Sequence, residues 1–395
     1  EYQLDHRYTR DSGRIYVTGV QALVRLPLMQ RQRDRAAGLN TAGFISGYRG
    51  SPLGTYDMAL WQASEHLARS HVHFEPGVNE DLAATAVWGS QLVPSFEGAR
   101  YDGVFGVWYG KGPGVDRSCD ALKHGNYQGA SQHGGVLVLA GDDPGARSSS
   151  IAHGSEAALI HMGIPILNPA TIQDYLDLGL YGWAMSRYSG CWIGFKCLTD
   201  TVESAASVSI SPERVQISSP PDFEMSGDAR TGSPVASEEV LYHRRLPAVQ
   251  AFARAHGLDR VIFDAPRKRL GIVATGKAYL DVRQSLEELG LDHTVRAMAL
   301  PLHRRLVHPA EGNPQSVPYG RAGEQIWTVQ RTELARLLLE RASNHPNVSF
   351  AFGLRCRHVD LSEPKMLVED EHGHQQWLRA EKIIATDGAY SSVRQ

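Results

Sequence analysis

Four loops in the first 150 residues carry side chains that could do chemistry. They cover residues 47–52, 77–80, 109–114 and 141–150, and each joins glycine or proline to charged or hydroxyl side chains. The carboxylate of Glu80 could exchange a proton, and the ammonium of Lys111 or the hydroxyl of Ser51 could bind an anion. These loops are therefore candidates for a functional site.

Each loop also has a purely structural explanation. Glu80 opens a predicted helix, where the helix dipole favours an acidic residue by up to about 1 kcal/mol. Lys111 lies in a glycine-rich loop that lacks the GxxxxGK[ST] spacing of a phosphate-binding loop, so it could belong to a simple turn. Residues 142–145 form an ordinary turn sequence, and the serines that follow could cap a helix. Taken singly, each motif leaves both explanations open.

The strands and helices predicted around the four loops indicate where the loops lie. Short apolar, β-branched runs alternate with helical patterns between residues 14 and 200, which is typical of βαβ units around a mostly parallel sheet. We predict a doubly wound α/β domain with strands at 43–46, 71–75, 103–108, 135–140 and 190–196. Helices are expected at 20–37, 81–92, 121–129 and 171–189. Ligands of such folds bind at the carboxyl ends of the strands, where the loops lie.

The chain divides into four predicted regions. Residues 1–208 form the α/β domain, and residues 209–245, rich in Ser, Pro, Gly and Asp, are expected to be an irregular linker. Residues 246–290 resemble the start of a second, truncated α/β domain, with a strand at 270–274 and a helix at 278–289. Residues 291–395 show an α+β pattern, with a helix at 332–344 and a hairpin formed by 365–370 and 375–385.

Composition excludes several classes of function. The net charge is −3 with Lys and Arg scattered along the chain, which argues against nucleic-acid or membrane-surface binding. No apolar run approaches the roughly 18 residues that span a bilayer, so we expect a soluble, cytoplasmic protein. The cysteines are too far apart for a CxxC pair or an iron–sulfur ligand run, and we predict no metal site. The chain begins with Glu1 and stops at Gln395 just after a predicted strand and turn, so we expect it to be cut at both ends.

Taken together and in order, the four loops resemble the N-terminal region of indolepyruvate ferredoxin oxidoreductases. These are thiamine-diphosphate-dependent 2-oxoacid:ferredoxin oxidoreductases, and the resemblance covers about residues 1–290. Its most specific stretches are 47–52, 76–80, 140–150 and 163–169. The resemblance implies that residues 1–208 are the domain that binds the pyrimidine half of the cofactor, followed by the start of a transketolase-C-like domain.

This resemblance implies roles for several residues. Glu80 would be catalytic, contacting N1′ of the cofactor's aminopyrimidine, and Ser51 and Lys111 would face the carboxylate of the substrate. The implied cofactor-binding set is Gly47, Gly50, Ser51, Pro52, Asn79 and Glu80. The intact family oxidises an aryl 2-oxoacid to an acyl-coenzyme A with ferredoxin as electron acceptor, using Mg²⁺ and a [4Fe-4S] cluster, and we expect it to be a homo-oligomer. The diphosphate-binding domain and the cluster cysteines are missing from this chain, so we expect no activity from the chain alone.

Residues 293–395 resemble the middle of kynurenine 3-monooxygenase, a flavoprotein that uses FAD and NADPH. The stretches that carry this resemblance are 304–308, 318–321, 327–331 and 385–394. It implies that Arg331 pairs with the substrate carboxylate and that Asp387 and Gly388 lie near the flavin. A tight turn at 387–388 and a solvated arginine at a helix start are the structural alternatives.

Three hypotheses follow from the two resemblances. The chain could be a fragment of a thiamine-diphosphate oxidoreductase, or a fragment of an aromatic hydroxylase. It could also be a chimera of two coding segments with no function of its own, because both families are interrupted near residue 290.

Overall fold

A computed structural model describes residues 3–225, 234–262, 272–287, 346–360 and 363–383, with short segments at 300–302, 304–307, 315–318, 326–328, 336, 339–340 and 342–344. The chain forms two compact units, residues 1–284 and 285–395. Each unit is described by itself.

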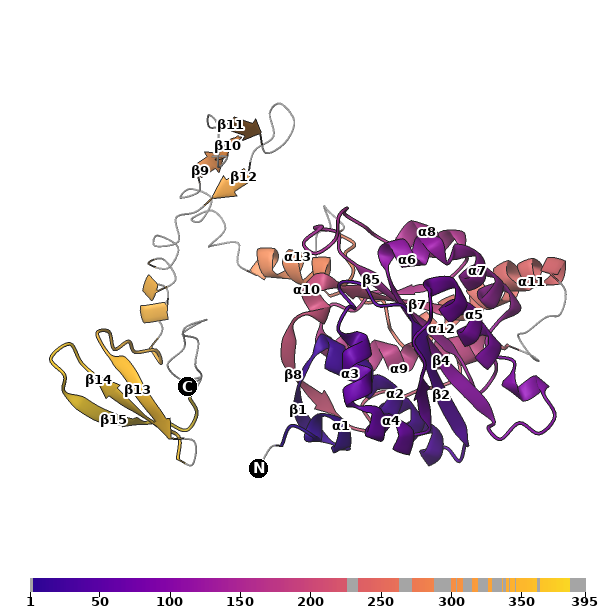
Figure 1. Ribbon diagram of the computed structural model, residues 1–395, viewed down its shortest axis with the longest axis horizontal. Coiled ribbons are helices and arrows are strands. Elements are labelled where there is room, and N and C mark those ends of the chain that lie inside the picture. Colours follow the sequence, from indigo (N-terminus) through magenta and orange to yellow (C-terminus); the bar gives the residue numbers. More distant parts are fainter. Residues whose placement is uncertain are drawn as a thin grey trace. The chain divides into compact units, whose positions relative to one another are not determined.

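The first unit is built on a six-stranded sheet (Figure 1). All its pairings are parallel, and the strand order is β3-β2-β4-β5-β7-β6. The strands are β2 (Thr41–Gly47), β3 (Val72–Phe74), β4 (Gly103–Lys111), β5 (Val136–Asp142), β6 (Ile166–Leu167) and β7 (Ile193–Leu198). The predicted α/β class with a mostly parallel sheet is confirmed.

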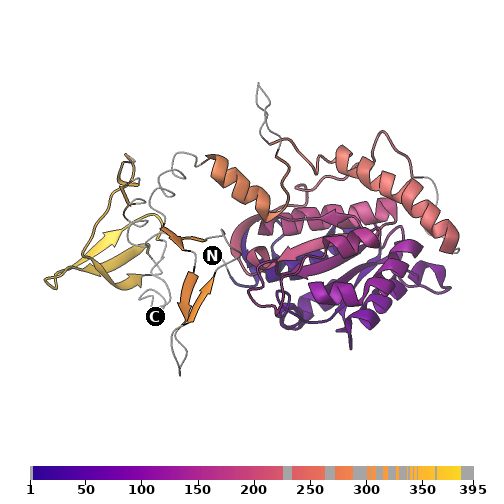
Figure 2. The same cartoon turned by 90° about the horizontal axis from the view of Figure 1, so that it is seen from above.

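Helices cover both faces of this sheet (Figures 1 and 2). The helices that the structure describes are α1 (His6–Thr9), α2 (Gly19–Ala36), α3 (Tyr56–Gln62), α4 (Ser64–Arg69), α5 (Glu80–Ser90), η1 (Val93–Ser95), α6 (Gly112–Arg117), α7 (Cys119–Gln128), α8 (Glu156–His161), α9 (Ile172–Ser189), α10 (Thr199–Val202), α11 (Pro234–Val240), η2 (Leu241–Arg245), α12 (Leu246–Ala255) and α13 (Lys277–Glu287).

Successive side chains of each strand point to opposite faces of the sheet, so the core has two layers. In β4, Phe105 and Val107 join one apolar cluster with α2 and α9, whereas Trp108 joins a second cluster with α5 and α7. In β5, Leu137 and Val138 divide between the two layers in the same way. Because both faces are covered, the strands read as nearly continuous apolar runs.

Local sequence defines the ends of the two longest helices. Thr18 forms a capping box with Gln21 at the start of α2, and Thr171 forms one with Asp174 at the start of α9. The helix α9 ends at Gly190, whose φ of +80° favours glycine. Both helices lie within a residue or two of the predicted ranges.

Residues 209–245 differ from the predicted irregular linker. An antiparallel pair of strands, β1 (Gly13–Thr18) and β8 (Ala205–Ile210), reaches its first two residues. Residues 234–245 are helical, and α11, η2 and α12 follow one another as one long helix (Figure 2). Its middle turn is a π-helix. Such a turn interrupts the 3.6-residue apolar period between α11 and α12.

In the region 246–290, α12 and the greater part of α13 belong to the first unit. The ring of Phe252 in α12 lies 5.9 Å from that of Tyr188 in α9. The predicted helix at 278–289 corresponds to α13, whereas residues 272–274 of the predicted strand are not in a strand. Residues 270–271 lie outside the described part of the chain.

The second unit contains small antiparallel sheets. The strands β9 (Leu300–Leu302) and β12 (Ile326–Thr328) pair, as do β10 (Arg304–Val307) and β11 (Gln315–Pro318). A three-stranded sheet follows, with order β13 (Arg355–Asp360), β14 (Lys365–Glu369) and β15 (Gln375–Arg379). The β14–β15 pair is the predicted hairpin. Residues 336, 339–340 and 342–343 are helical within the predicted helix at 332–344.

Two buried thiols should make the stability of the first unit fall at alkaline pH. Burial raises the pKa of Cys191 to about 12 and raises that of Cys197 as well. An unfolded chain loses these protons near pH 8.5, so above that pH it binds fewer protons than the folded chain and stability falls. We expect a loss of about 2 kcal/mol between pH 8 and 9.5, measured by urea unfolding. The variant Cys191→Ala should lose about half as much stability over this range, because Cys197 still contributes. A urea midpoint of the parent protein that does not change between pH 8 and 9.5 would contradict the prediction.

No helix in the described residues has the length and apolar character needed to cross a membrane.

Candidate functional site

The four loops singled out from the sequence share one edge of the sheet. They follow β2, β3, β4 and β5 at their carboxyl ends, and these four strands are neighbours in the sheet. Gly47, Lys111 and Asp142 are the last residues of β2, β4 and β5. The parallel topology therefore brings the loops together at the edge where this class of fold binds ligands.

Glu80 is a buried acid at the corner between β3 and α5. It is the first residue of α5 and only 6% exposed. Asn79 caps the helix, because its side-chain oxygen accepts a hydrogen bond from the backbone N–H of Leu82 at 2.9 Å. Trp108 Nε1 donates to the carbonyl oxygen of Glu80 at 3.1 Å. These contacts fix the backbone that carries the carboxylate, and they give Asn79 a structural role.

The side chain of Glu80 points at the short helix α6. A Cβ atom added to Gly114 would lie 3.0 Å from Glu80 Oε1, so only glycine leaves this space open. Arg117 Nη1 lies 3.7 Å from Glu80 Oε2, and its Nε donates to the exposed Asp81 at 3.1 Å. The carboxylate is therefore held beside the loop that follows β4, away from bulk water.

The loop after β2 lies against the loop after β4. A Cβ atom on Gly50 would be 2.8 Å from Lys111 Cδ, so the lysine stem packs over this glycine. A Cβ atom on Gly47 would be 2.2 Å from the carbonyl oxygen of Tyr109. The N–H of Gly77 donates to the Gly47 carbonyl oxygen at 2.8 Å, which ties in the loop after β3. The glycines of the sequence motifs thus allow close backbone approach.

Ser51 joins this loop to the one after β5. Its Oγ lies 2.5 Å from Ser148 Oγ, and the Ser51–Pro52 peptide bond is cis. Asp143 accepts hydrogen bonds from the backbone N–H groups of Ser148 and Arg147, which lower the pKa of its carboxyl. The turn explanation for residues 142–145 is therefore right for Asp143, whose carboxylate folds its own loop.

A buried polar network beside α6 was not predicted. The Asp142 carboxylate, fully buried, accepts hydrogen bonds from the N–H and Oγ of Ser155 and lies 2.9 Å from Lys196 Nζ. His153 Nδ1 lies 3.6 Å from Asp142 Oδ1, and its Nε2 lies 2.8 Å from Asp116 of α6. The His153 ring also fills the space beside Gly112. This network fixes the helix that Glu80 faces.

No sequence signal identified that network, because its members come from separate elements. Lys196 stands on β7 and meets Asp142 only through the parallel pairing of β5 with β7. Glu156, at the start of α8, pairs with the same lysine.

Three site residues were expected in the second unit. Arg331, Asp387 and Gly388 lie outside the described residues. Among the residues that the structure describes, no group of three His, Cys, Asp or Glu side chains is arranged to hold a metal ion.

Comparison with known proteins finds two similarities. Residues 259–318 match the family model of the indolepyruvate ferredoxin oxidoreductase middle domain. The match crosses position 290, where we expected this resemblance to end. The chain is also 33% identical over 132 residues to kynurenine 3-monooxygenase of Caenorhabditis briggsae, which covers 28% of each protein. The enzyme of Stenotrophomonas maltophilia is 33% identical over 114 residues, or 28% of this chain and 25% of the relative.

A solved structure of 2-oxoglutarate:ferredoxin oxidoreductase from Magnetococcus marinus aligns with 71% of this chain and 52% of its own, with a TM-score of 0.45 and 13% identity. The chain spans about a quarter of the length of the curated relatives that it matches. Both predicted resemblances are confirmed: the chain is similar to two different classes of oxidoreductase.

Proposed function

We propose that the first unit is the pyrimidine-binding part of a thiamine-diphosphate-dependent 2-oxoacid:ferredoxin oxidoreductase. The observation that carries the proposal is Glu80, a buried carboxylate at a strand-to-helix corner that faces α6, the helix directly after β4. The match of residues 259–318 to the indolepyruvate oxidoreductase family supports the same class.

The residues at this edge fit the pyrimidine half of the cofactor. An aminopyrimidine needs a carboxyl group beside N1′, and Glu80 supplies one that is 6% exposed, with Gly114 on one side and the Arg117 guanidinium 3.7 Å away. When bound, thiamine diphosphate supplies the carbanion chemistry that decarboxylates a 2-oxoacid. Glu80 would hold a proton between its carboxylate and N1′ of the ring. Asn79 would keep that carboxylate in place through the helix cap.

Two further side chains would bind the substrate. The stem of Lys111 packs on Gly50 and its exposed ammonium can pair with a carboxylate, while Ser51 can donate a hydroxyl hydrogen bond. The proposed substrate is an aryl 2-oxoacid, with coenzyme A as acyl acceptor and ferredoxin as electron acceptor. The diphosphate- and magnesium-binding domain and the [4Fe-4S] cluster would be supplied by other segments or chains, and the assembly would be a homo-oligomer.

Hydrogen–deuterium exchange tests this proposal by locating the ligand. In this proposal the first unit binds only the pyrimidine half of the cofactor, so we expect thiamine diphosphate to bind with a dissociation constant on the order of 1 mM, about −4 kcal/mol. At saturating cofactor and Mg²⁺, residues 47–52, 77–83 and 109–115 should exchange more slowly. No protection in these segments, or micromolar binding by the chain alone, would contradict the proposal.

The kynurenine 3-monooxygenase similarity supports a second proposal, a flavin-binding hydroxylase fragment in residues 293–395. Here Arg331 would bind the substrate carboxylate, and Asp387 with Gly388 would lie near FAD. A flavin absorption band that remains after reconstitution and gel filtration would support it, and a colourless protein would reject it.

The presence of both similarities in one chain favours a third proposal, a chimera of two coding segments. Sequencing of the source DNA across residues 288–294 would test this proposal.

A further inference from the structure

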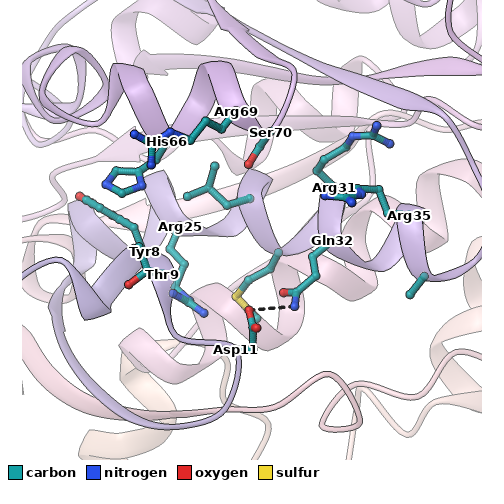
Figure 3. Close-up of a pocket in the computed structure, with 13 residues that line it drawn as sticks. Tyr8, Thr9, Asp11, Arg25, Arg31, Gln32, Arg35, His66, Arg69 and Ser70 are labelled. Atoms are coloured by element: carbon teal, nitrogen blue, oxygen red, sulfur yellow. Dashed lines mark hydrogen bonds between the residues drawn. The ribbon is translucent and has the colours of Figure 1, made fainter.

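A cavity of about 610 Å³ lies on the first unit between α1, α2 and α4 (Figure 3). Four arginines line it, Arg25, Arg31, Arg35 and Arg69, against a single carboxylate, Asp11. That carboxylate already accepts a hydrogen bond from Gln32 Nε2 at 3.0 Å. Arg69 pairs with Glu65 at 3.0 Å, so the excess of positive charge on the cavity wall comes from the three arginines of α2.

This cavity is separate from the candidate thiamine site. The helix α2 leads into β2 and α4 leads into β3, so the carboxyl ends of these helices lie at the amino ends of the strands. The cavity is lined by the end of α4 and the second half of α2. It therefore occupies the edge of the sheet opposite the loops that surround Glu80.

Arg31 is the most informative of these cations. It is 7% exposed, and its two terminal nitrogens donate to neutral acceptors, the Leu39 carbonyl at 3.1 Å and Asn40 Oδ1 at 3.3 Å. Its Nε is buried and has no hydrogen-bond partner among the described residues. A buried guanidinium is costly unless it is paired with a negative charge. Among the described residues, no carboxylate forms an ion pair with Arg31.

Arg35 adds a second charge one turn further along α2, and Figure 3 shows the two side chains on the same side of the cavity. Like charges four residues apart destabilise a helix. The helix dipole explains a cation in the last turn, where Arg35 lies together with Arg33. It does not explain why Arg31 and Arg35 face one cavity, whereas Arg33 donates to the Pro212 carbonyl outside it.

We propose that this cavity binds a phosphate-bearing small molecule of nucleotide size. Guanidinium groups pair with phosphate oxygens in a forked geometry, and a dianion would satisfy Arg31 and Arg35 together. The volume lies in the range of small-molecule sites, and Leu28 and Met29 give the cavity an apolar wall for the rest of the ligand.

Calorimetric titration of the full chain tests this inference with three probes: ADP, inorganic pyrophosphate and adenosine. At about 0.15 M salt, we expect ADP and pyrophosphate to bind at one site per chain and adenosine to bind at least about tenfold more weakly. Equal binding of adenosine and ADP would overturn the inference, as would the absence of saturable binding by either phosphate probe.

Matched variants on α2 make the test specific. Arg35→Gln changes an exposed side chain and should weaken ADP binding about tenfold, while Arg33→Gln, on the same helix, should change it less than about twofold. Equal weakening by both variants would show general charge attraction and reject the site. Exchange protection by ADP should fall on residues 25–36 and 66–70 and spare 77–83, so this inference and the thiamine proposal can fail independently.

Discussion

Replacing Asp34 with alanine should lower the free energy of unfolding of the first unit by about 3–5 kcal/mol. Asp34 is 3% exposed on α2, and its two carboxylate oxygens accept hydrogen bonds from Arg187 Nη1 at 2.6 Å and Nη2 at 2.8 Å. Thr41 and Gln30 donate to the same carboxylate. One side chain thus joins α2, α9 and β2, and its removal leaves a mostly buried guanidinium unpaired.

Urea unfolding followed by tryptophan fluorescence measures this loss. The matched control is Glu65→Gln, which breaks the exposed pair with Arg69 and should change stability by less than about 0.5 kcal/mol. Combining Asp34→Ala with Arg187→Met should cost less than the sum of the single changes, because the two side chains act as a pair. A loss below about 1 kcal/mol for Asp34→Ala would show that the pair does not hold these elements together.

Much of this fold could be predicted because local signals agree with the tertiary structure. The apolar runs at 43–46, 103–108 and 135–140 became β2, β4 and β5, and apolar spacing of three and four residues predicted the two longest helices, α2 and α9. Parallel topology then placed four loops at one edge without any knowledge of side-chain contacts.

Other features could not be predicted because they depend on contacts between distant segments. The pairing of β1 with β8 joins residues almost 200 positions apart. The π-helical turn at Leu241–Arg245 hides the apolar period of the helix around it, although Arg245 is buried and donates to the carbonyls of Asn126 and Tyr127.

In the candidate site, too, some residues could be predicted from local sequence and others depend on contacts between distant segments. The positions of Glu80, Lys111 and the glycines follow from their places at strand ends. The network of Asp142, His153 and Lys196 depends on sheet register and on a loop after β5, so neither spacing nor composition indicated it.

Replacing Glu80 with glutamine should abolish most of the binding of an aminopyrimidine to the first unit. The carboxylate would form a charge-assisted hydrogen bond to the ring, whereas the amide offers a neutral oxygen or an N–H group that competes for the same position. We expect the dissociation constant to rise by more than about tenfold, the equivalent of 1.4 kcal/mol. The fold should be retained, because glutamine matches glutamate in shape and the helix cap comes from Asn79.

Asp81→Asn is the control for this change. It removes the neighbouring carboxylate, which is partly exposed and pairs with Arg117, and it should leave pyrimidine binding within about twofold of the parent protein. Far-UV circular dichroism of both variants checks that the helix α5 is intact.

The most direct measurement is an NMR titration of the chain and of Glu80→Gln with 4-amino-5-hydroxymethyl-2-methylpyrimidine, the pyrimidine half of thiamine. We expect saturable shifts of amides in 77–83 and 109–115 in the parent protein, and their loss in the variant. Equal affinity of the two proteins, or shifts confined to other parts of the chain, would contradict a thiamine-binding role for Glu80.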